Sequence, residues 1–347
     1  MAGINLFTTR TMMGVYEEYD APGSHFLDRY FPRVQTFTTE LVDFDLIQKG
    51  GPKLAPFVMP TAAGRPMRSK GVVTKTFKPA YVKPLTEVDP TRPFTRRAGE
   101  RYGGDLSPAE RRQAAITEIL LDHRNQVLRR KEFMAGELLR TGMVTIEGED
   151  YPRVVVDFGR DPTLTAALTG GNRWGQTGVD PIKTLEDKAA LTQAKSGLPA
   201  TEVTFSPKAW TLFRANERVE RLLDNRRQVS GEIEMGPIAR GGPDKPKHRY
   251  VGNIGDFDFW TYDDLAEADD GSSFNLMGEF DVIQAAPQVN GVQAHGAIRD
   301  PRAGYQALEL FPKNWIDENP SAEWVMTASS PLVVLPLPNG TCCTAVS

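Results

Sequence analysis

The longest regular alternation of apolar and polar positions in the chain runs through residues 107–141. Its apolar positions recur at steps of four and seven residues, which places the side chains on one face of an α-helix. They are Ile116, Leu120, Val127, Met134 and Leu138. Residues 107–110 (SPAE) have the sequence of a capping box with proline at the first helical position, and Gly142 supplies a stop. The pattern predicts a helix of about 33 residues, roughly 50 Å long at 1.5 Å per residue. Such a helix suits a strut better than a member of a bundle.

Alternating β-forming residues predict strands on both sides of this helix. FTTELVDFDLI (37–47) alternates in part and ends at the turn residues 49–52. MVTIEGEDYPRVVVDFGR (143–160) predicts a hairpin that turns at Gly148. The β-forming pattern returns after residue 300, and we expect those tail strands to pair with the hairpin.

Residues 181 to about 300 have a different sequence pattern, which predicts short helices alternating with short strands. The predicted helices are DPIKTLEDKAALTQA and SPKAWTLFRANERVERLL, and the predicted strands are VTF (203–205), GDFDFWTYDDL and NLMGEFDVIQAAP. This stretch is long enough to bury a core of its own. The sequence therefore predicts a domain inserted into a discontinuous one.

FKPAYVKPLTEVDP (77–90) combines three prolines with bulky apolar residues. Proline excludes a helix and pushes the residue before it towards extended backbone. Residues 53–100 contain two strand-like runs, KLAPFVMP and GVVTKTFKPAYV, with TAAGRPMRSK between them. They predict a two-stranded excursion with a mobile basic tip. An isolated ribbon is marginal in water, so we expect its apolar residues to bind another surface.

Composition places the 347-residue chain among folded soluble proteins, since 40% of its residues are hydrophobic and 25% charged. The net charge of −4 argues against nucleic acid or an anionic membrane as the main partner. No apolar run approaches the ~20 residues that span a bilayer, and the first residues lack signal-peptide features. We expect synthesis and folding in a cytoplasm. Cys342 and Cys343 are adjacent, which indicates two reduced thiols in a loose tail.

Catalytic motifs are absent from the sequence. There is no phosphate loop, nucleophile elbow or HExxH helix, and the four histidines are far apart. We expect His123 to have a polar-face or capping role on the long helix. The acidic run DDLAEADDG (263–271) lacks the spacing of a calcium loop and indicates a solvated loop. No catalytic, cofactor-binding or metal-binding residue is therefore assigned.

The stretch 92–131 is basic, with nine arginines and Lys131. Arginine favours ion pairs with carboxylates and also binds phosphates. We favour ion pairs, within or between subunits, over nucleic-acid contact, because the same stretch also contains acidic residues, namely Glu100, Asp105, Glu110, Glu118 and Asp122. The candidates for ion pairing or interior contact are Arg111, Arg112, Arg129, Arg130 and Lys131.

Five segments in this order resemble the major capsid proteins of lambda-like tailed bacteriophages, the phage major capsid protein E family, which have the Hong Kong 97 capsid fold. The segments are YFPRVQTFTTELVDFDLI (30–47), RSKGVVTKTFKPAYVKPLTEVDP (68–90), VDFGRDP (156–162), FSPKAWTLFRANERVERLLDNRR (205–227) and FPKNWIDENP with SSPLVVLPLP (311–338). The resemblance runs from about residue 5 to 338.

The resemblance implies an α+β fold with an N-terminal arm, an extended E-loop, a long spine helix, a discontinuous P-domain and an inserted axial A-domain. The implied boundaries are 1–47 for the arm and first strand, 48–100 for the E-loop, 101–142 for the spine helix, 143–180 for the P-domain hairpin and loop, 181–299 for the A-domain, and 300–347 for the return to the P-domain sheet and the tail. This order matches the elements that the hydrophobic pattern predicts.

The resemblance implies a shell protein of the virion capsid that forms hexamers and pentamers around double-stranded DNA. It implies assembly in the bacterial host cytoplasm as a procapsid on a scaffolding protein, with a portal at one vertex, and expansion on packaging. It further implies a small decoration protein rather than Lys–Asn cross-links. DNA contact would be weak and interior, and no membrane is involved.

In such shells the E-loop lies over the neighbouring subunit. The candidates for that contact are Arg68, Lys70, Lys75, Phe77, Lys78, Tyr81, Val82 and Lys83. Two functions of another class stay open at this point: a phage-encoded enzyme, or a DNA-binding protein of the packaging or tail machinery. The second would bind duplex DNA with a steep salt dependence.

Overall fold

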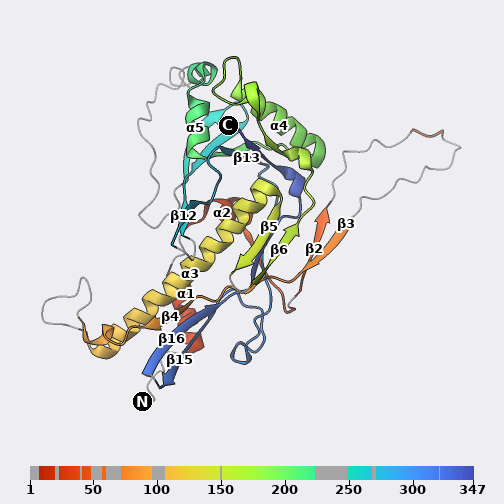
Figure 1. The fold of residues 1–347 in the computed structure, drawn as a ribbon. Helices are drawn as coiled ribbons and strands as arrows, with labels where there is room; N and C mark the ends of the chain where they lie inside the picture. Colours follow the sequence, from red (N-terminus) through yellow and green to blue (C-terminus); the bar gives the residue numbers. More distant parts are fainter. Residues whose placement is uncertain are drawn as a thin grey trace.

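The long helix α3 (Pro108–Thr141) is the axis around which the other elements are arranged (Figure 1). The computed structural model describes residues 8–19, 23–39, 41–47, 57–59, 72–95, 106–148, 151–222, 248–267, 271–319 and 321–347. A six-stranded sheet with helices α4 and α5 lies beyond one end of α3, and a three-stranded sheet with α1 lies along the other half. The fold is therefore α+β, as the sequence predicts.

The other helices are α1 (Thr9–Glu18), α2 (His25–Tyr30), α4 (Pro181–Ser196) and α5 (Pro207–Arg214). The first nine strands are β1 (Arg33–Thr36), β2 (Val42–Ile47), β3 (Val72–Phe77), β4 (Leu85–Val88), β5 (Met143–Gly148), β6 (Tyr151–Asp157), β7 (Thr165–Ala167), β8 (Glu202–Phe205) and β9 (His248–Ile254). The remaining strands are β10 (Phe257–Tyr262), β11 (Leu265–Glu267), β12 (Ser273–Asn275), β13 (Asp281–Ala285), β14 (Val292–His295), β15 (Phe311–Glu318), β16 (Ser321–Ala328), β17 (Pro331–Val334) and β18 (Thr341–Ala345).

Both ends of α3 are made by the residues that the sequence singles out. The Ser107 side chain accepts from the Glu110 N–H, and the Glu110 carboxylate accepts from the Ser107 N–H, so the capping box is complete. Gly142 ends the helix at φ +78°, where a side chain would be strained and would also meet Arg160. Arg160 in turn donates to the carbonyls of Leu139 and Arg140, which satisfies the last turn.

The six-stranded sheet has the order β7-β18-β13-β8-β10-β9 and draws its strands from both sides of the predicted insert. β18, from the C-terminal end, pairs with β13 and with β7. Cys342 and Cys343 therefore lie buried in a sheet, and the expectation of a loose tail is wrong. A cluster with Phe205, Phe213 and Phe259 fills the space between this sheet and α5.

The strands after residue 300 do not pair with the predicted hairpin. β15 and β16 form a three-stranded antiparallel sheet with β4, which comes from the 77–90 stretch. β17 pairs with β14, whose other neighbour is β1. The 143–160 hairpin exists as the β5–β6 pair, a two-stranded sheet of its own. The hairpin prediction is confirmed, and the pairing predicted for the tail is wrong.

The ribbon at the side of the body consists of β2 and β3, which pair antiparallel from Val42↔Phe77 to Ile47↔Val72 (Figure 1). Its first limb is therefore the 37–47 segment rather than KLAPFVMP, most of which lies outside the described residues. Phe44 stacks on Phe158 with ring centroids 5.2 Å apart, so the base of the ribbon packs on the segment after β6.

The helices predicted after residue 180 and after Ser206 both exist, but the second is shorter than predicted. α5 ends at Arg214, and a separate helical turn covers residues 217–222. The Asn216 side chain accepts from the Arg218 N–H and so caps the new turn. The sequence reading missed this cap inside an otherwise helical pattern.

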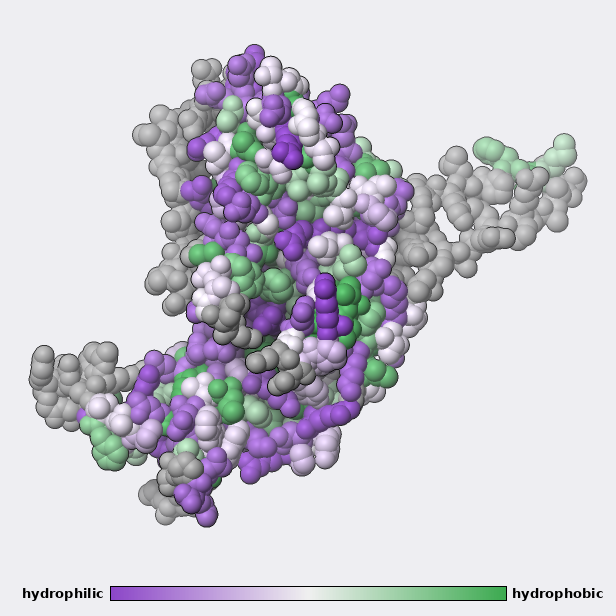
Figure 2. All heavy atoms as spheres, in the orientation of Figure 1, coloured by the Kyte–Doolittle hydropathy of each residue, from purple (hydrophilic) through white to green (hydrophobic). Residues whose placement is uncertain are grey.

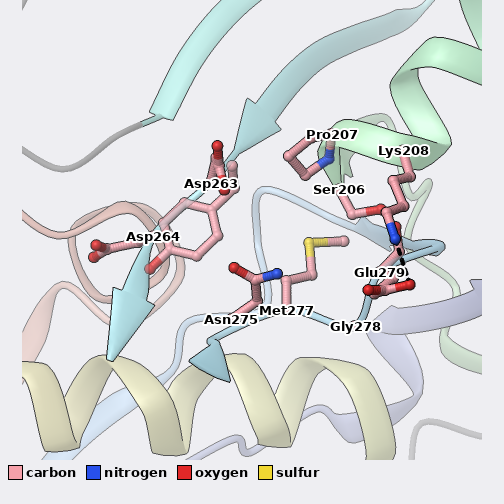
Figure 3. A pocket seen from close by; sticks show the side chains of 10 residues that line it. Ser206, Pro207, Lys208, Asp263, Asp264, Asn275, Met277, Gly278 and Glu279 are labelled. Atoms are coloured by element: carbon pink, nitrogen blue, oxygen red, sulfur yellow. Dashed lines mark hydrogen bonds and ion pairs between the residues drawn. The ribbon is translucent and has the colours of Figure 1, made fainter. Parts of the chain in front are cut away.

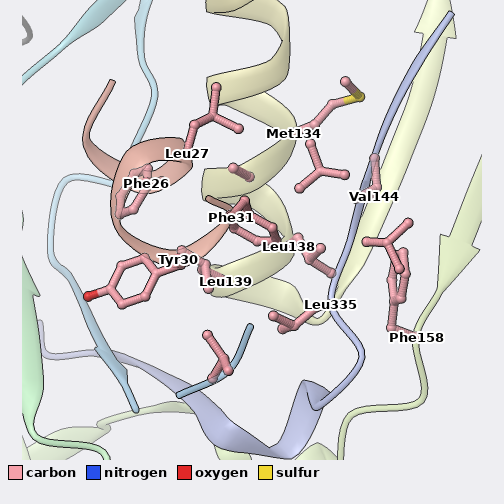
Figure 4. Close-up of a cluster of buried hydrophobic side chains, with 14 of the residues drawn as sticks. Phe26, Leu27, Tyr30, Phe31, Met134, Leu138, Leu139, Val144, Phe158 and Leu335 are labelled. Carbon is pink, nitrogen blue, oxygen red and sulfur yellow. The ribbon is translucent and has the colours of Figure 1, made fainter. Parts of the chain in front are cut away.

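The largest core cluster lies where α2 packs on α3 (Figure 4). Phe26, Leu27 and Tyr30 of α2 lie against the face of α3 that carries Leu138 and Leu139. Every side chain in this contact is buried, so the contact holds the N-terminal segment on the long helix through the hydrophobic effect.

Within the described ranges, no helix has both the length and the apolar character that a bilayer crossing requires.

Candidate assembly surfaces

The predicted contact residues at the base of the ribbon have partners in their own chain. Lys75 Nζ donates to the Asp157 carbonyl at 2.5 Å, and Phe77 stacks on Phe44 with centroids 5.6 Å apart. Lys78 also takes part in an interaction within the chain. Arg68 and Lys70 lie outside the described part of the chain. A role of these residues between subunits therefore stays a prediction.

Residues 81–83 continue this intramolecular packing. The Tyr81 hydroxyl donates to the Ala297 carbonyl at 2.8 Å, and the Lys83 ammonium lies 4.9 Å from the centre of the Tyr81 ring. Val82 forms a β-bridge with Ser329. The 77–90 stretch thus packs against other segments of its own chain, and binding of its residues to a neighbouring subunit stays a prediction.

The basic residues of α3 serve mainly as intramolecular donors. Arg112 forms two hydrogen bonds, each 2.7 Å long, to the carboxylate of Glu323, and this bonding raises the pKa of Arg112. Lys131 is buried and donates to Glu309 at 2.6 Å and to Gln293 at 3.0 Å. Both residues thus form ion pairs within the subunit.

The other basic candidates on α3 are more accessible. Arg129 donates to the Leu265 carbonyl at 3.0 Å, which ties α3 to β11. Arg130 is exposed and borders a pocket beside α3. Arg111 is half-buried and has a partner in the chain. Contact of these residues with a packaged genome stays a prediction.

Glu132 joins α2 to α3 in a way that the sequence reading missed. One of its carboxylate oxygens accepts from the N–H groups of His25 and Phe26 at 3.0 and 2.8 Å, and the other accepts from Leu27 N–H at 3.0 Å. The carboxylate therefore caps the start of α2 from a different helix. Burial raises the pKa of Glu132 to about 7, against the lowering effect of these three donors.

The opposite side of α2 is bonded to the six-stranded sheet. Arg29 forms two hydrogen bonds to the Glu202 carboxylate, at 2.5 and 2.7 Å, and lies 4.2 Å from the Trp260 ring centre. His25 lies 3.1 Å from the Thr204 hydroxyl and stacks on His248. Burial, then His248 and Arg29, lowers the pKa of His25 well below its ordinary value. α2 thus links the long helix to the sheet.

His123 joins α3 to the three-stranded sheet from a buried position. Its ring nitrogens lie 2.8 Å from the Thr86 hydroxyl and 3.2 Å from that of Thr327. Burial lowers the pKa of His123 to about 4. The predicted polar-face or capping role is therefore wrong, because this face of α3 is covered by β4 and β16.

Three apolar side chains of the described segment 57–59 project away from the body. Phe57, Val58 and Met59 are 105%, 45% and 76% exposed. The segment lies at the far right of Figure 1, and Figure 2 shows hydrophobic spheres at that end of the molecule. Contiguous exposed apolar residues are typical of interaction sites.

Ser206, Lys208 and Glu279, three of the polar residues that line the pocket beside the start of α5, already interact with other groups of the chain (Figure 3). The Ser206 hydroxyl donates to the Glu279 carbonyl and accepts from Ala209 N–H, so it acts as a helix cap. Lys208 pairs with the Glu279 carboxylate at 2.6 Å. No histidine lines this pocket, and the described residues contain no cluster of His, Cys, Asp and Glu that could hold a metal ion.

Comparisons with known proteins identify one family. A family model described as phage major capsid protein E matches residues 8–346. The chain is 29% identical over 340 residues to the major capsid protein of Escherichia phage lambda, with 97% of this chain and 98% of that protein covered. It is 28% identical to the major capsid protein of Enterobacteria phage P21, with the same coverage.

Solved structures agree at the level of the fold. The putative capsid protein of a prophage of E. coli CFT073 superposes with a TM-score of 0.74 at 23% identity, covering 98% of this chain and 99% of that one. The capsid structure of cyanophage P-SCSP1u superposes with a TM-score of 0.53 at 10% identity, covering 100% and 92%. The Hong Kong 97-like fold is therefore confirmed.

Proposed function

Because the chain belongs to the phage major capsid protein E family, whose model matches residues 8–346, we infer that it builds the capsid shell of a lambda-like tailed phage. The match over nearly the whole chain is the observation that carries this inference. The relatives from phages lambda and P21 are major capsid proteins and are covered almost end to end. Its role is structural, as a subunit that assembles with copies of itself.

Within that role, we propose that the β2–β3 ribbon and the segment beyond it are the E-loop. The exposed apolar segment 57–59 supports this assignment, since each copy would cover it with a neighbour. Predicted contact residues nearer the body, such as Lys75 and Phe77, would position the base of the ribbon. Hexamers and pentamers follow from head-to-tail contacts that close into rings.

The domain assignments are part of the same proposal. α3 is the spine helix, and the β5–β6 hairpin with the three-stranded sheet of β4, β15 and β16 is the P-domain. The six-stranded sheet with α4 and α5 is the axial A-domain, and it takes β7 and β18 from outside residues 181–299. Residues before β2 are the N-terminal arm, which α2 fastens to α3.

The proposed partners are a scaffolding protein, a portal, a small decoration protein and the packaged double-stranded DNA. Assembly as a procapsid in the host cytoplasm, followed by expansion, belongs to the proposal. The net charge of −4 supports weak contact with DNA, because counterion release favours strongly basic surfaces. Intramolecular bonds of Arg112 and Lys131 support the same conclusion, since they remove two cations from that role.

Electron microscopy of the purified protein, made with and without the scaffolding gene product of its phage, tests this function. We expect closed shells or regular sheets of hexamers. Dispersed monomers under both conditions would contradict it, and binding of those monomers to duplex DNA with a steep salt dependence would favour a DNA-binding protein instead.

A further inference from the structure

A lysine, a glutamine and a glutamate that are far apart in the sequence meet beside α3. The side chain of Lys131 on α3 is only 2% exposed. Its Nζ atom donates to Gln293 Oε1 at 3.0 Å and to Glu309 Oε1 at 2.6 Å. Gln293 lies on β14, the central strand of the β1-β14-β17 sheet, and Glu309 lies two positions before β15. An amine, an amide and a carboxylate are therefore within hydrogen-bonding distance of one another in a buried place.

The Gln293 amide is held with its carbonyl oxygen towards the lysine. Gln293 Nε2 donates to the Phe31 carbonyl at 2.8 Å, which leaves Oε1 on the side of Lys131. The backbone of Gln293 is paired on both sides, with Val34 of β1 and Val333 of β17. Reacting groups that are held in contact reach effective concentrations of about 10⁵–10⁸ M. The amine is therefore positioned for reaction with the amide carbon.

Glu309 is suited to take a proton from Lys131. Burial alone would raise the pKa of Glu309, but the charge of Lys131 and its hydrogen bond lower it overall, so the group is a carboxylate. Passing one proton from Nζ to Oε1 leaves two neutral groups, which burial favours because buried charges are costly. The buried His295 ring lies 3.8 Å from Glu309 Oε1. Burial, and then the charge of Lys131, lower the pKa of His295, so it is neutral at pH 7 and leaves the carboxylate to the lysine.

We propose that Lys131 and Gln293 form an amide bond with each other in the folded chain, with Glu309 as the catalytic carboxylate. Glu309 takes a proton from Nζ, and the freed lone pair attacks Cδ of Gln293. The Nζ–Cδ bond forms and the Cδ–Nε2 bond breaks. Of the three protons on Nζ, one stays on the new amide, and two pass through Glu309 to Nε2, which leaves as ammonium. Atoms and charge balance without an oxidant, a reductant or another reactant. The Glu309 side chain is 42% exposed, which gives the ammonium a way out to solvent.

The bond would join α3 covalently to the β1-β14-β17 sheet. Lys131 and Gln293 are 162 positions apart, and the closed loop contains every strand of the six-stranded sheet except β18. A covalent link across a long loop restricts the unfolded chain and so favours the folded one. Each copy forms the bond within itself, so the bond does not depend on the shell function.

Mass spectrometry of the purified, denatured chain tests the bond. We expect a mass that is lower than the calculated one by one molecule of ammonia. A trypsin digest should contain a branched peptide that joins residue 131 to residue 293, because trypsin does not cleave after an acylated lysine. The full calculated mass together with cleavage after Lys131 would overturn the proposal. Because the unmodified chain carries the branched peptide, this measurement does not require any variant to fold.

Lys131→Arg keeps the cation and removes the nucleophile, so its measured mass should equal the calculated one. Ammonia can also be lost by ring closure at the two Asn-Gly sequences, Asn290–Gly291 and Asn339–Gly340. Such a loss would persist in Lys131→Arg. The same deficit in this variant and in the unmodified chain would therefore overturn the proposal.

A matched pair of variants tests the role of Glu309. Glu309→Gln should lower the cross-linked fraction at least about tenfold, because general acid–base catalysis typically contributes 10²–10⁴-fold. Glu323→Gln makes the same change in another carboxylate that pairs with a cation, Arg112. It should leave the cross-linked fraction unchanged. Equal fractions in the two variants would overturn the assignment of Glu309 as the catalytic carboxylate.

Discussion

At the scale of single residues, Glu132 and His123 show how buried polar groups connect the parts of this molecule. Each lies on α3 and bonds to an element far away in the sequence: Glu132 to the start of α2, and His123 to strands β4 and β16. Buried polar groups are costly unless they are hydrogen-bonded. Their partners therefore specify one relative position of the elements.

Glu132→Ala should destabilise the subunit strongly, because it leaves three N–H groups of α2 without an acceptor. An unsatisfied buried donor costs about 1–3 kcal/mol, so the expected loss in the free energy of unfolding is at least about 3 kcal/mol. Urea denaturation of dispersed subunits, followed by circular dichroism, measures it. Glu118→Ala on the exposed face of the same helix is the control, and its surface ion pair with Arg92 predicts a change below about 1 kcal/mol. Equal losses from both variants would contradict the capping role.

The contribution of His123 to the stability of the subunit should be lost as the pH falls. The folded protein holds the pKa of His123 at about 4, while the unfolded chain has an ordinary histidine near 6.5. Below pH 6.5 the unfolded state therefore binds the proton more readily, and the stabilising contribution is lost as the pH falls from about 6.5 through 4.

His123→Gln removes this titration while keeping a side chain that can hydrogen-bond. We expect the melting temperature of this variant to fall less steeply between pH 7 and 5 than that of the unmodified chain. The buried His25 and His295, whose pKa values burial also lowers, keep part of the slope. Parallel slopes for the two proteins would show that His123 does not carry the effect.

At the scale of elements, the ribbon has two parts. The paired strands β2 and β3 belong to the fold, and the segment between them is available for assembly. β2 and β3 pair through the register Ile47↔Val72, and Phe44 fastens them to the body through Phe158. The segment between residues 47 and 72 contains the exposed residues 57–59. Removing β3 would therefore damage the fold, whereas removing the segment beyond the pair should not.

Replacing residues 48–71 with Asn-Gly joins β2 to β3 by a two-residue hairpin turn of the type that antiparallel strands favour. We expect a circular dichroism spectrum and a melting temperature close to those of the unmodified chain. Closed shells should be absent in electron micrographs, because the proposed contact with the next copy is gone. Normal shells from this variant would contradict the E-loop assignment.

At the scale of the whole molecule, the two ends of the chain complete structures that begin elsewhere. α2 lies between the long helix and the six-stranded sheet, and β18 lies between β13 and β7 in that sheet. Strand order in this sheet thus depends on residues about 180 positions apart in the sequence, such as Thr165 and Cys343. The subunit is consequently one cooperative structure rather than a domain with a detachable insert.

Removal of residues 341–347 should abolish cooperative folding, because it deletes β18 from the interior of the sheet. We expect loss of the sigmoidal melting curve and rapid cleavage in limited proteolysis. Removal of Ser347 alone is the control, since Ser347 is exposed and lies beyond the strand. A cooperative transition in the longer truncation would restore the view of this segment as a loose tail.

The long helix, its two ends, the β5–β6 hairpin and the helix after residue 180 could be predicted from the sequence. The signals for them lie within a few residues of each other: a capping box at residues 107–110, a glycine at 142, and periods of four and seven. The exposed segment 57–59 was part of a run read as a strand. The exposure of its side chains follows only from the tertiary structure, which shows that no other described part of the chain covers Phe57.

The sequence by itself determined the local elements and, through their order and similarity, the family. Only the tertiary structure decided which strands pair, that the cysteines are buried, and that Glu132 caps a helix about 100 residues away. The physical reason is that helix periods and caps arise from contacts between near neighbours, whereas a strand offers the same backbone hydrogen bonds to any partner. Which partner a strand takes depends on which of its faces remain to be buried when the whole chain packs.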